Sequence, residues 1–181
     1  PQAPDVEPAA VAEARRRVAA VLADRGGHLK DFRKPFMKFK RGLDERQAAT
    51  IDRLVGDWLA CDMGWPKGTL CAALAVEAAR GGAEDVAEAL LAMHGSQLLD
   101  FQVLQRPRRK KAPGGPGVAL ARISTDELVW ATAVPLTARP PVGTWLQARL
   151  WPAGHGRWTL APGIIVRTGE VDLDPQPDSP H

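Results

Sequence analysis

Residues 106–117 read RPRRKKAPGGPG, and this stretch separates two parts of the chain that follow different hydrophobic patterns. It contains three prolines, three glycines and five basic residues, and none of its side chains is able to close a hydrophobic core. We therefore interpret residues 106–117 as a basic linker. The residues before it predict helices, and the residues after it predict short strands.

The part before the linker carries apolar residues at helical spacing. The clearest signal follows Gly42: Asp44 and Gln47 fit a capping box, and the next apolar residues form one stripe, made of Ile51, Leu54, Val55, Trp58 and Leu59. Further helices are expected over residues 7–23, from 66 or 67 to 80, and over 84–94, each followed by glycine. Residues 28–40 predict a short or kinked helix, because Pro35 interrupts the pattern. Residues 96–104 fit either a last helix or a first strand.

The part after the linker has the pattern of a small β structure. Short runs rich in Val, Ile, Trp and Thr are separated by Pro and Gly, and they cover residues 118–123, 127–136, 144–151, 157–160 and 164–166. The predicted fold class is α+β: an N-terminal helical, bundle-like domain (6–105) joined by the linker to a small antiparallel β-barrel or curled sheet (118–173). Residues 1–5 and the acidic residues 174–181 are expected to be disordered.

Composition excludes collagen-like, coiled-coil and wholly disordered proteins. Of 181 residues, 45% are hydrophobic and 25% are charged, as in ordinary globular chains. No run of about 18 apolar residues occurs, so we expect no membrane span. The two cysteines, Cys61 and Cys71, cannot form a disulfide framework, and this favours a cytoplasmic protein.

Basic residues are concentrated although the net charge is only +3. Six lie between positions 30 and 41 with a single acid among them, and five lie between 106 and 111 with none. The residues after Arg167 are acidic instead. Segregated charge of this kind attracts polyanions. The alternative is that both runs are solvated surface.

Residues 56–74 resemble a helix-turn-helix. Ala60, Gly64 and Leu70 have the spacing of the small residue, the turn glycine and the aliphatic residue of that motif. In this interpretation Lys67 and Thr69 would be the first side chains to reach a DNA groove. The helix after them is rich in alanine and has few groups that read base edges. A helical corner with no contact to bases explains the same spacing and is favoured.

No catalytic, cofactor-binding or metal-binding residue is predicted, and we expect the protein not to be an enzyme. The four histidines are far apart in the sequence, Cys61 and Cys71 lack a metal or redox spacing, and there is no phosphate-binding loop with its lysine. His155, between two glycines, is interpreted as a hairpin residue. An arrangement such as Asp57, Asp62 and His94 would have to be assembled by the fold alone.

The sequence thus predicts a non-enzymatic nucleic-acid-binding protein that contacts mainly phosphates, on DNA or RNA, with weak sequence selectivity. The predicted contact residues are Lys30, Arg33, Lys34, Lys38, Lys40, Arg41, Lys67, Thr69, Arg106, Arg108, Arg109, Lys110 and Lys111. The alternative is a protein–protein adaptor that uses a groove of the helical domain and the β module. The nucleic-acid hypothesis and the adaptor hypothesis differ in where they place the rings of Phe32, Phe36 and Phe39. Buried rings favour nucleic acid, and an exposed apolar patch favours a protein partner. The tryptophans of the β module form either a base-stacking platform or, more simply, its core, with at most one or two exposed.

Overall fold

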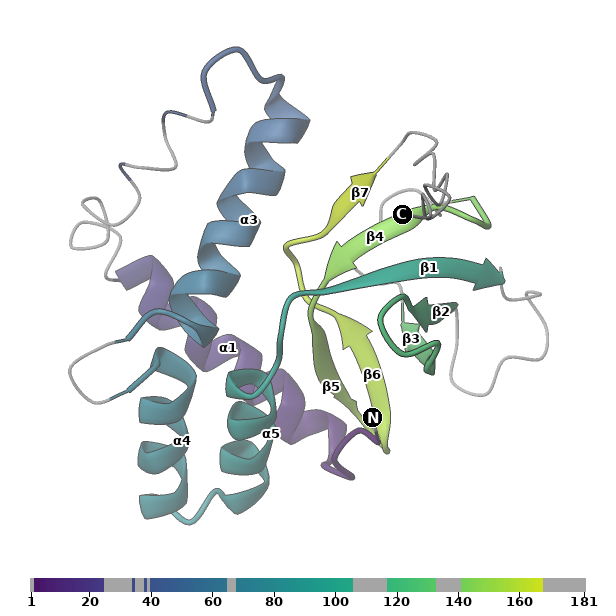
Figure 1. The fold of residues 1–181 in the computed structure, drawn as a ribbon. Coiled ribbons are helices and arrows are strands. Elements are labelled where there is room, and N and C mark those ends of the chain that lie inside the picture. The colour runs from purple at the N-terminus through teal and green to yellow at the C-terminus, as the bar shows by residue number, and fades with distance from the viewer. Residues whose placement is uncertain are drawn as a thin grey trace, which may run out of the picture.

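The computed structural model describes residues 2–24, 34, 38, 40–64, 68–105, 117–132 and 141–167. Helices and strands lie on opposite sides of the molecule (Figure 1), which makes it a mixed α+β fold. The described helices are α1 (Pro8–Asp24), α3 (Glu45–Cys61), α4 (Leu70–Arg80) and α5 (Glu84–His94). The described strands are β1 (Leu99–Gln105), β2 (Gly117–Arg122), β3 (Leu128–Thr132), β4 (Trp145–Ala148), β5 (Leu150–Gly154), β6 (Arg157–Leu160) and β7 (Ile165–Arg167).

Helix α3 begins at the predicted capping box. An Asp44 carboxylate oxygen accepts a hydrogen bond from the Gln47 backbone N–H at 2.8 Å, and the Gln47 side-chain oxygen accepts one from the Asp44 N–H at 3.1 Å. The two contacts satisfy N–H groups that the first turn leaves without helical partners. The apolar stripe that follows is buried at Val55 and Leu59. This prediction is confirmed.

The other helices follow the sequence with one shift. Helix α5 has the predicted bounds, and α1 differs from its prediction by one residue at each end. Helix α4 begins at Leu70, later than predicted, because the Thr69 side chain caps it through the Ala72 N–H. Gly68 before it has φ +101°, a conformation that cannot continue a helix. None of the described helices is long and apolar enough to cross a membrane.

The sheet is mixed and open, and this corrects the prediction of an antiparallel barrel. Its strand order is β5-β6-β3-β2-β1-β4-β7, and β3 pairs with β6 in parallel. Closure would require β5 to pair with the other edge of the sheet. Among the described strands, β7 occupies that side of β4, so β5 and β7 remain as two edges.

The sheet is nevertheless strongly curled. Strand β5 forms one edge of the sheet and β4 lies next to the other edge, yet Arg149 alone separates these two strands in the chain. The run predicted as one strand over 144–151 is therefore bent at Arg149 into two. The concave face encloses a core with Phe101, Leu120 and Leu146 at its centre, all at most 1% exposed.

Strand β1 settles the segment that the sequence left ambiguous. Residues 99–105 form a strand that pairs with β2 on one side and with β4 on the other. The sequence analysis placed the end of the helical domain at residue 105. Strand β1 therefore comes from the predicted helical domain but pairs with strands that follow the linker.

Helices and sheet are joined by a shared core. Trp151 on β5 is buried among helical residues that include Ala14 and Leu90. Two backbone carbonyls add hydrogen bonds: Pro152 accepts from the Arg15 guanidinium at 2.7 Å, and Val6 accepts from the His155 N–H at 3.1 Å. His155 has φ +52° in the β5–β6 turn, which confirms its interpretation as a hairpin residue.

Candidate nucleic-acid interface and buried polar junction

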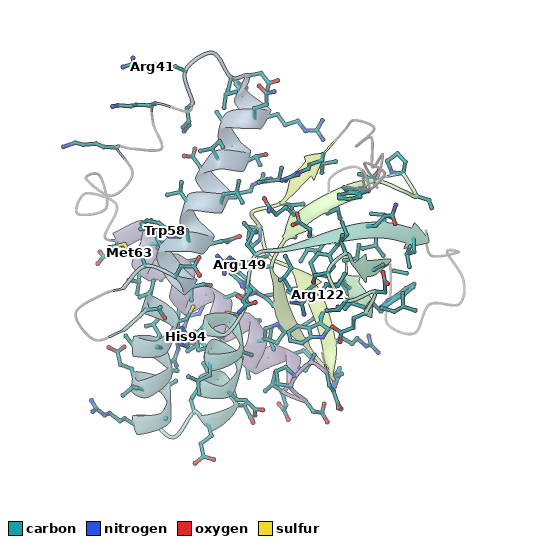
Figure 2. The ribbon with its side chains drawn as sticks, in the orientation of Figure 1. Arg41, Trp58, Met63, His94, Arg122 and Arg149 are labelled. Atoms are coloured by element: carbon teal, nitrogen blue, oxygen red, sulfur yellow. The ribbon has the colours of Figure 1, made fainter. Side chains whose placement is uncertain are left out.

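The described part of the first basic run lies just before helix α3. Lys34, Lys38 and Arg41 are exposed, and Arg41 lies at the N-terminal end of α3 (Figure 2). The Lys40 ammonium is held by the Asp52 carboxylate, with Nζ–O distances of 2.7 and 2.9 Å. The structure therefore leaves the charges of Lys38 and Arg41 directed to solvent, whereas Lys40 is paired within the fold.

Sequence reasoning missed two further cations on α3. Arg46 and Arg53 are exposed and seven residues apart, so they lie on one face of the helix. Acidic residues are interspersed with them, namely Asp44, Glu45 and Asp52. Arg46 and Arg53 could have been identified from their seven-residue spacing within the predicted helix, although they are not part of a run of charge.

Most of the other predicted contact residues lie outside the described residues. These are Lys30, Arg33, Lys67, Arg106, Arg108, Arg109, Lys110 and Lys111, and the same holds for Phe32, Phe36 and Phe39. The chain stretch with the five cations of residues 106–111 joins the end of β1 to the start of β2.

The segment that resembles a helix-turn-helix packs as a helical corner. Ala60, Leu70 and Leu74 are all buried in one core cluster. Thr69 is 8% exposed, and its hydroxyl lies 2.9 Å from His94 Nδ1 besides capping α4. Gly64 has an ordinary φ, and a methyl group added there would meet nothing within 4 Å. The described residues of this segment thus serve packing and capping.

The outer face of the sheet carries two of the tryptophans. Because side chains alternate along a strand, Trp130 and Trp145 lie on the face opposite the buried core, and both are partly exposed. Trp151 is instead buried against the helices, and Trp158 packs against the core of the sheet. Trp158 is partly exposed as well, but none of the four rings is among the exposed side chains, which agrees with the prediction that at most one or two are exposed.

A buried polar junction connects α3 to the sheet. Arg149 is 6% exposed at the bend between β4 and β5; it donates to the Ser96 carbonyl at 2.7 Å and forms an ion pair with Asp62. The Asp57 carboxylate is 5% exposed and accepts a hydrogen bond from the Gly163 N–H at 2.7 Å. Figure 2 shows Arg149 between α3 and the sheet.

Burial dominates the electrostatics of this junction. It raises the pKa of Asp57 to about 7, against the opposing effects of the Gly163 N–H and of Arg149. Gly163 is required here, because a Cβ atom at this position would lie 2.6 Å from Asp57 Oδ2 and 2.8 Å from Leu54 Cα. The fold therefore brings Asp57 and Asp62 to one arginine, whereas His94 bonds to Thr69. With Asp57 and Arg149 packed away from solvent, the junction serves to hold helix and sheet together.

Cys61 and Cys71 adjoin this junction as free, buried thiols. They are hydrogen-bonded to each other, which lowers the pKa of Cys61 and raises that of Cys71. Their interpretation as small core residues is confirmed by burial at 3% and 0% exposure. Among the residues that the structure describes, no group of three or more His, Cys, Asp or Glu side chains is placed to hold a metal ion.

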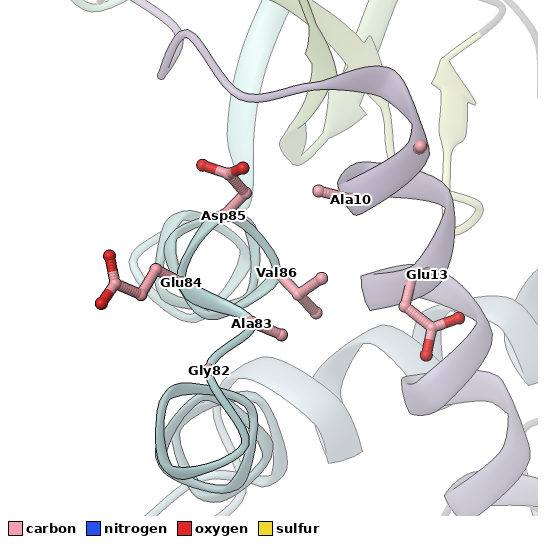
Figure 3. Close-up of a pocket in the computed structure, with 8 residues that line it drawn as sticks. Ala10, Glu13, Gly82, Ala83, Glu84, Asp85 and Val86 are labelled. Atoms are coloured by element: carbon pink, nitrogen blue, oxygen red, sulfur yellow. The ribbon is translucent and has the colours of Figure 1, made fainter.

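A cleft of about 470 Å³ lies between α1 and α5, and its charge is acidic (Figure 3). Glu13 projects from α1, while Glu84 and Asp85 begin α5. Hydrogen bonds from Arg16 and Arg17 lower the pKa of Glu13 to about 2, so this carboxylate stays ionised. Carboxylates do not attract phosphates, and none of the predicted contact residues lines this cleft.

Comparisons with protein-family models, with curated proteins and with solved structures give no match to this chain. Function is therefore inferred from charge and geometry.

Proposed function

We propose that the protein is a non-enzymatic nucleic-acid-binding protein of the cytoplasm that contacts mainly phosphates and has weak sequence selectivity. The observation that carries the proposal is the concentration of basic residues at two places. One is the entrance to α3, where Lys38 and Arg41 are exposed. The other is the connection between β1 and β2, where the sequence has five cations and no acid.

Phosphate contacts of this kind have a measurable signature. Each cation that neutralises a phosphate releases a counterion, so the logarithm of the affinity falls linearly with the logarithm of the salt concentration. The cations from Arg106 to Lys111 are expected to account for several units of that slope, since each contributes about one. Little discrimination between sequences is expected, because phosphates carry no sequence information.

The test is a salt titration of binding to short oligonucleotides. The wild type is compared with a variant in which Arg106, Arg108, Arg109, Lys110 and Lys111 are changed to Ala, and with the single-charge control Arg80→Ala on α4. We expect steep salt dependence for the wild type and the control, and a shallower slope for the five-alanine variant. Absence of binding at low salt would end the proposal.

A protein–protein adaptor is the second candidate. Val76 on α4 and Leu91 on α5 are 51% and 53% exposed, and both are large apolar side chains on the helical domain. A partner bound by this surface would be lost from the Val76→Lys, Leu91→Lys double variant and retained by the five-alanine variant. The opposite pattern is expected for nucleic acid.

A further inference from the structure

The outer face of the sheet carries two aromatic rings, Trp130 and Trp145, with side chains of mixed size between them. One row across the strands consists of Arg167, Trp145, Gln102, Ala121 and Leu128, which are register partners in turn on β7, β4, β1, β2 and β3. In the neighbouring row Trp130 on β3 is paired with Ala119 on β2. Between the two rings, β2 contributes the small side chains of Ala119 and Ala121, whereas β1 contributes Gln102 and the exposed Leu104.

The two rings are too far apart to stack on each other. Strands β1 and β2 lie between β4 and β3, so Trp145 and Trp130 are separated by three strand spacings, about 14 Å across the sheet. Aromatic pairs in contact have centroids about 4.5–7 Å apart. Each ring therefore offers its own surface to a ligand.

Trp130 is held in place by its neighbours on the sheet. A Cβ atom built on Gly117 would lie 2.7 Å from Trp130 Nε1 and 3.0 Å from its Cε2, so the indole covers the backbone of this glycine. A ring fixed in this way loses little conformational entropy when a planar group stacks on it. The face also has polar groups beside Trp145, namely the Gln102 amide and the exposed Arg167 guanidinium.

The described helices make few contacts with the strands of this face. Their contacts with the sheet are concentrated on β5, through α1 and α5, and β1 to β4 extend away from the helical side (Figure 1). On the described strand positions of this face, Asp100 supplies a carboxylate one row away from Trp145. Leu128, at the end of the first row, is 72% exposed.

We infer that this face is a stacking platform for unpaired bases, so that the protein binds single-stranded nucleic acid in preference to duplex. The inference rests on the proposed function, which supplies the phosphate contacts. Aromatic rings accept any base through its π face, which explains binding without sequence selectivity. Bases in a duplex are stacked on one another and cannot reach the rings. Arg167 beside Trp145 favours a nucleic acid over an apolar peptide as the occupant.

The experiment compares a single-stranded thymidine oligonucleotide with a duplex of equal length at one salt concentration. Trp130→Leu and Trp145→Leu each remove a ring while keeping apolar volume, Trp130→Phe and Trp145→Phe keep a ring, and Leu128→Ala is the control on the same face. We expect each Leu variant to weaken single-strand binding about tenfold. The Phe variants and Leu128→Ala should stay within about twofold, and duplex binding should stay unchanged throughout.

Three results would overturn the inference. The first is equal loss of single-strand and duplex affinity in the Leu variants, and the second is no loss in either. The third is that the wild type binds a proline-rich peptide, and that the Leu variants lose this peptide binding but keep their affinity for the single-stranded oligonucleotide. In all three the wild type still binds oligonucleotides through its cations, whereas failure of the proposed function would abolish wild-type binding to both oligonucleotides. The Phe variants separate loss of stacking from loss of folding, since both substitutions disturb the packing.

Discussion

The polar junction at Arg149 and the outer face of the sheet show two opposite uses of polar and aromatic side chains. At the junction, Arg149 is buried and bonded to Asp62 and to the Ser96 carbonyl. On the outer face, Trp130, Trp145 and Arg167 keep surface in contact with water. Groups with partners inside the fold determine its stability, whereas groups directed to solvent are available to a ligand. Substitutions at the two regions should therefore have separable effects.

The largest effect on stability is expected from Arg149→Met. The substitution leaves the Ser96 carbonyl without its donor, which costs about 1–3 kcal/mol. It also takes the cation from Asp62, whose side chain is 38% exposed, and this adds up to about 1 kcal/mol. Urea denaturation should show this loss, while Arg41→Ala, at an exposed arginine, should change the unfolding free energy by less than about 0.5 kcal/mol. Equal losses of stability in the two variants would show that the buried Arg149 contributes no more than an exposed arginine.

A second effect concerns pH. The pKa of Asp57 is about 7 in the folded protein, above its ordinary value of 3.8, so the unfolded chain releases this proton first. The stability that the protonated carboxyl provides is present below pH 4, and it is lost as the pH rises toward 7. Asp57→Asn cannot ionise and should be more stable than the wild type at pH 8 by on the order of 2–4 kcal/mol, with little difference at pH 4. Parallel stability curves for the two proteins between pH 4 and 8 would contradict this assignment.

A smaller loss is expected at the close approach of the chain to α3. Gly163→Ala would place a methyl group against Asp57 Oδ2 and the Leu54 backbone, and overpacking of this kind costs about 1–3 kcal/mol. Gly64→Ala is the matched control, because it meets nothing within 4 Å and its backbone φ is ordinary. Thermal unfolding of both variants measures the difference, and a destabilised Gly64→Ala would show that the turn after α3 is tighter than described.

The smallest effect is expected at the entrance to α3. Lys38→Ala with Arg41→Ala removes two exposed charges, so the salt slope of oligonucleotide binding should fall by between about 1 and 2. Lys40→Ala removes a cation already paired with Asp52 and should change the slope less. A larger change for Lys40 than for the other two would mean that nucleic acid displaces the Asp52 carboxylate.

Local patterns predicted the helices well, because their signals lie within a few residues of one another. The Asp44–Gln47 capping box and the apolar period after it located α3, and flanking glycines located the end of α5. The shift at α4 came from Thr69, whose capping role competes with the earlier start suggested by Pro66. The positive φ of Gly68 decides between these two helix starts, and the sequence does not determine that φ because glycine can adopt either sign.

The sheet and the junction depend on long-range contacts, and these could not be predicted. Nothing local indicates that β6 pairs in parallel with β3, or that one run of residues bends at Arg149 into β4 and β5. The meeting of Asp57 with Gly163 joins positions 106 residues apart. The outer tryptophans were partly accessible to sequence reasoning, since few rings fit inside so small a sheet, but which two remain outside depended on the register.

The most direct test measures stability and oligonucleotide affinity together in two variants. Gly163→Ala alters the junction, and the five-alanine variant of residues 106–111 alters the proposed phosphate contacts. We predict that Gly163→Ala lowers the unfolding free energy while the folded protein keeps its affinity. The five-alanine variant is expected to bind more weakly and with a shallower salt slope, while keeping its stability. A five-alanine variant that binds oligonucleotides as the wild type does, with the same salt slope, would contradict the account.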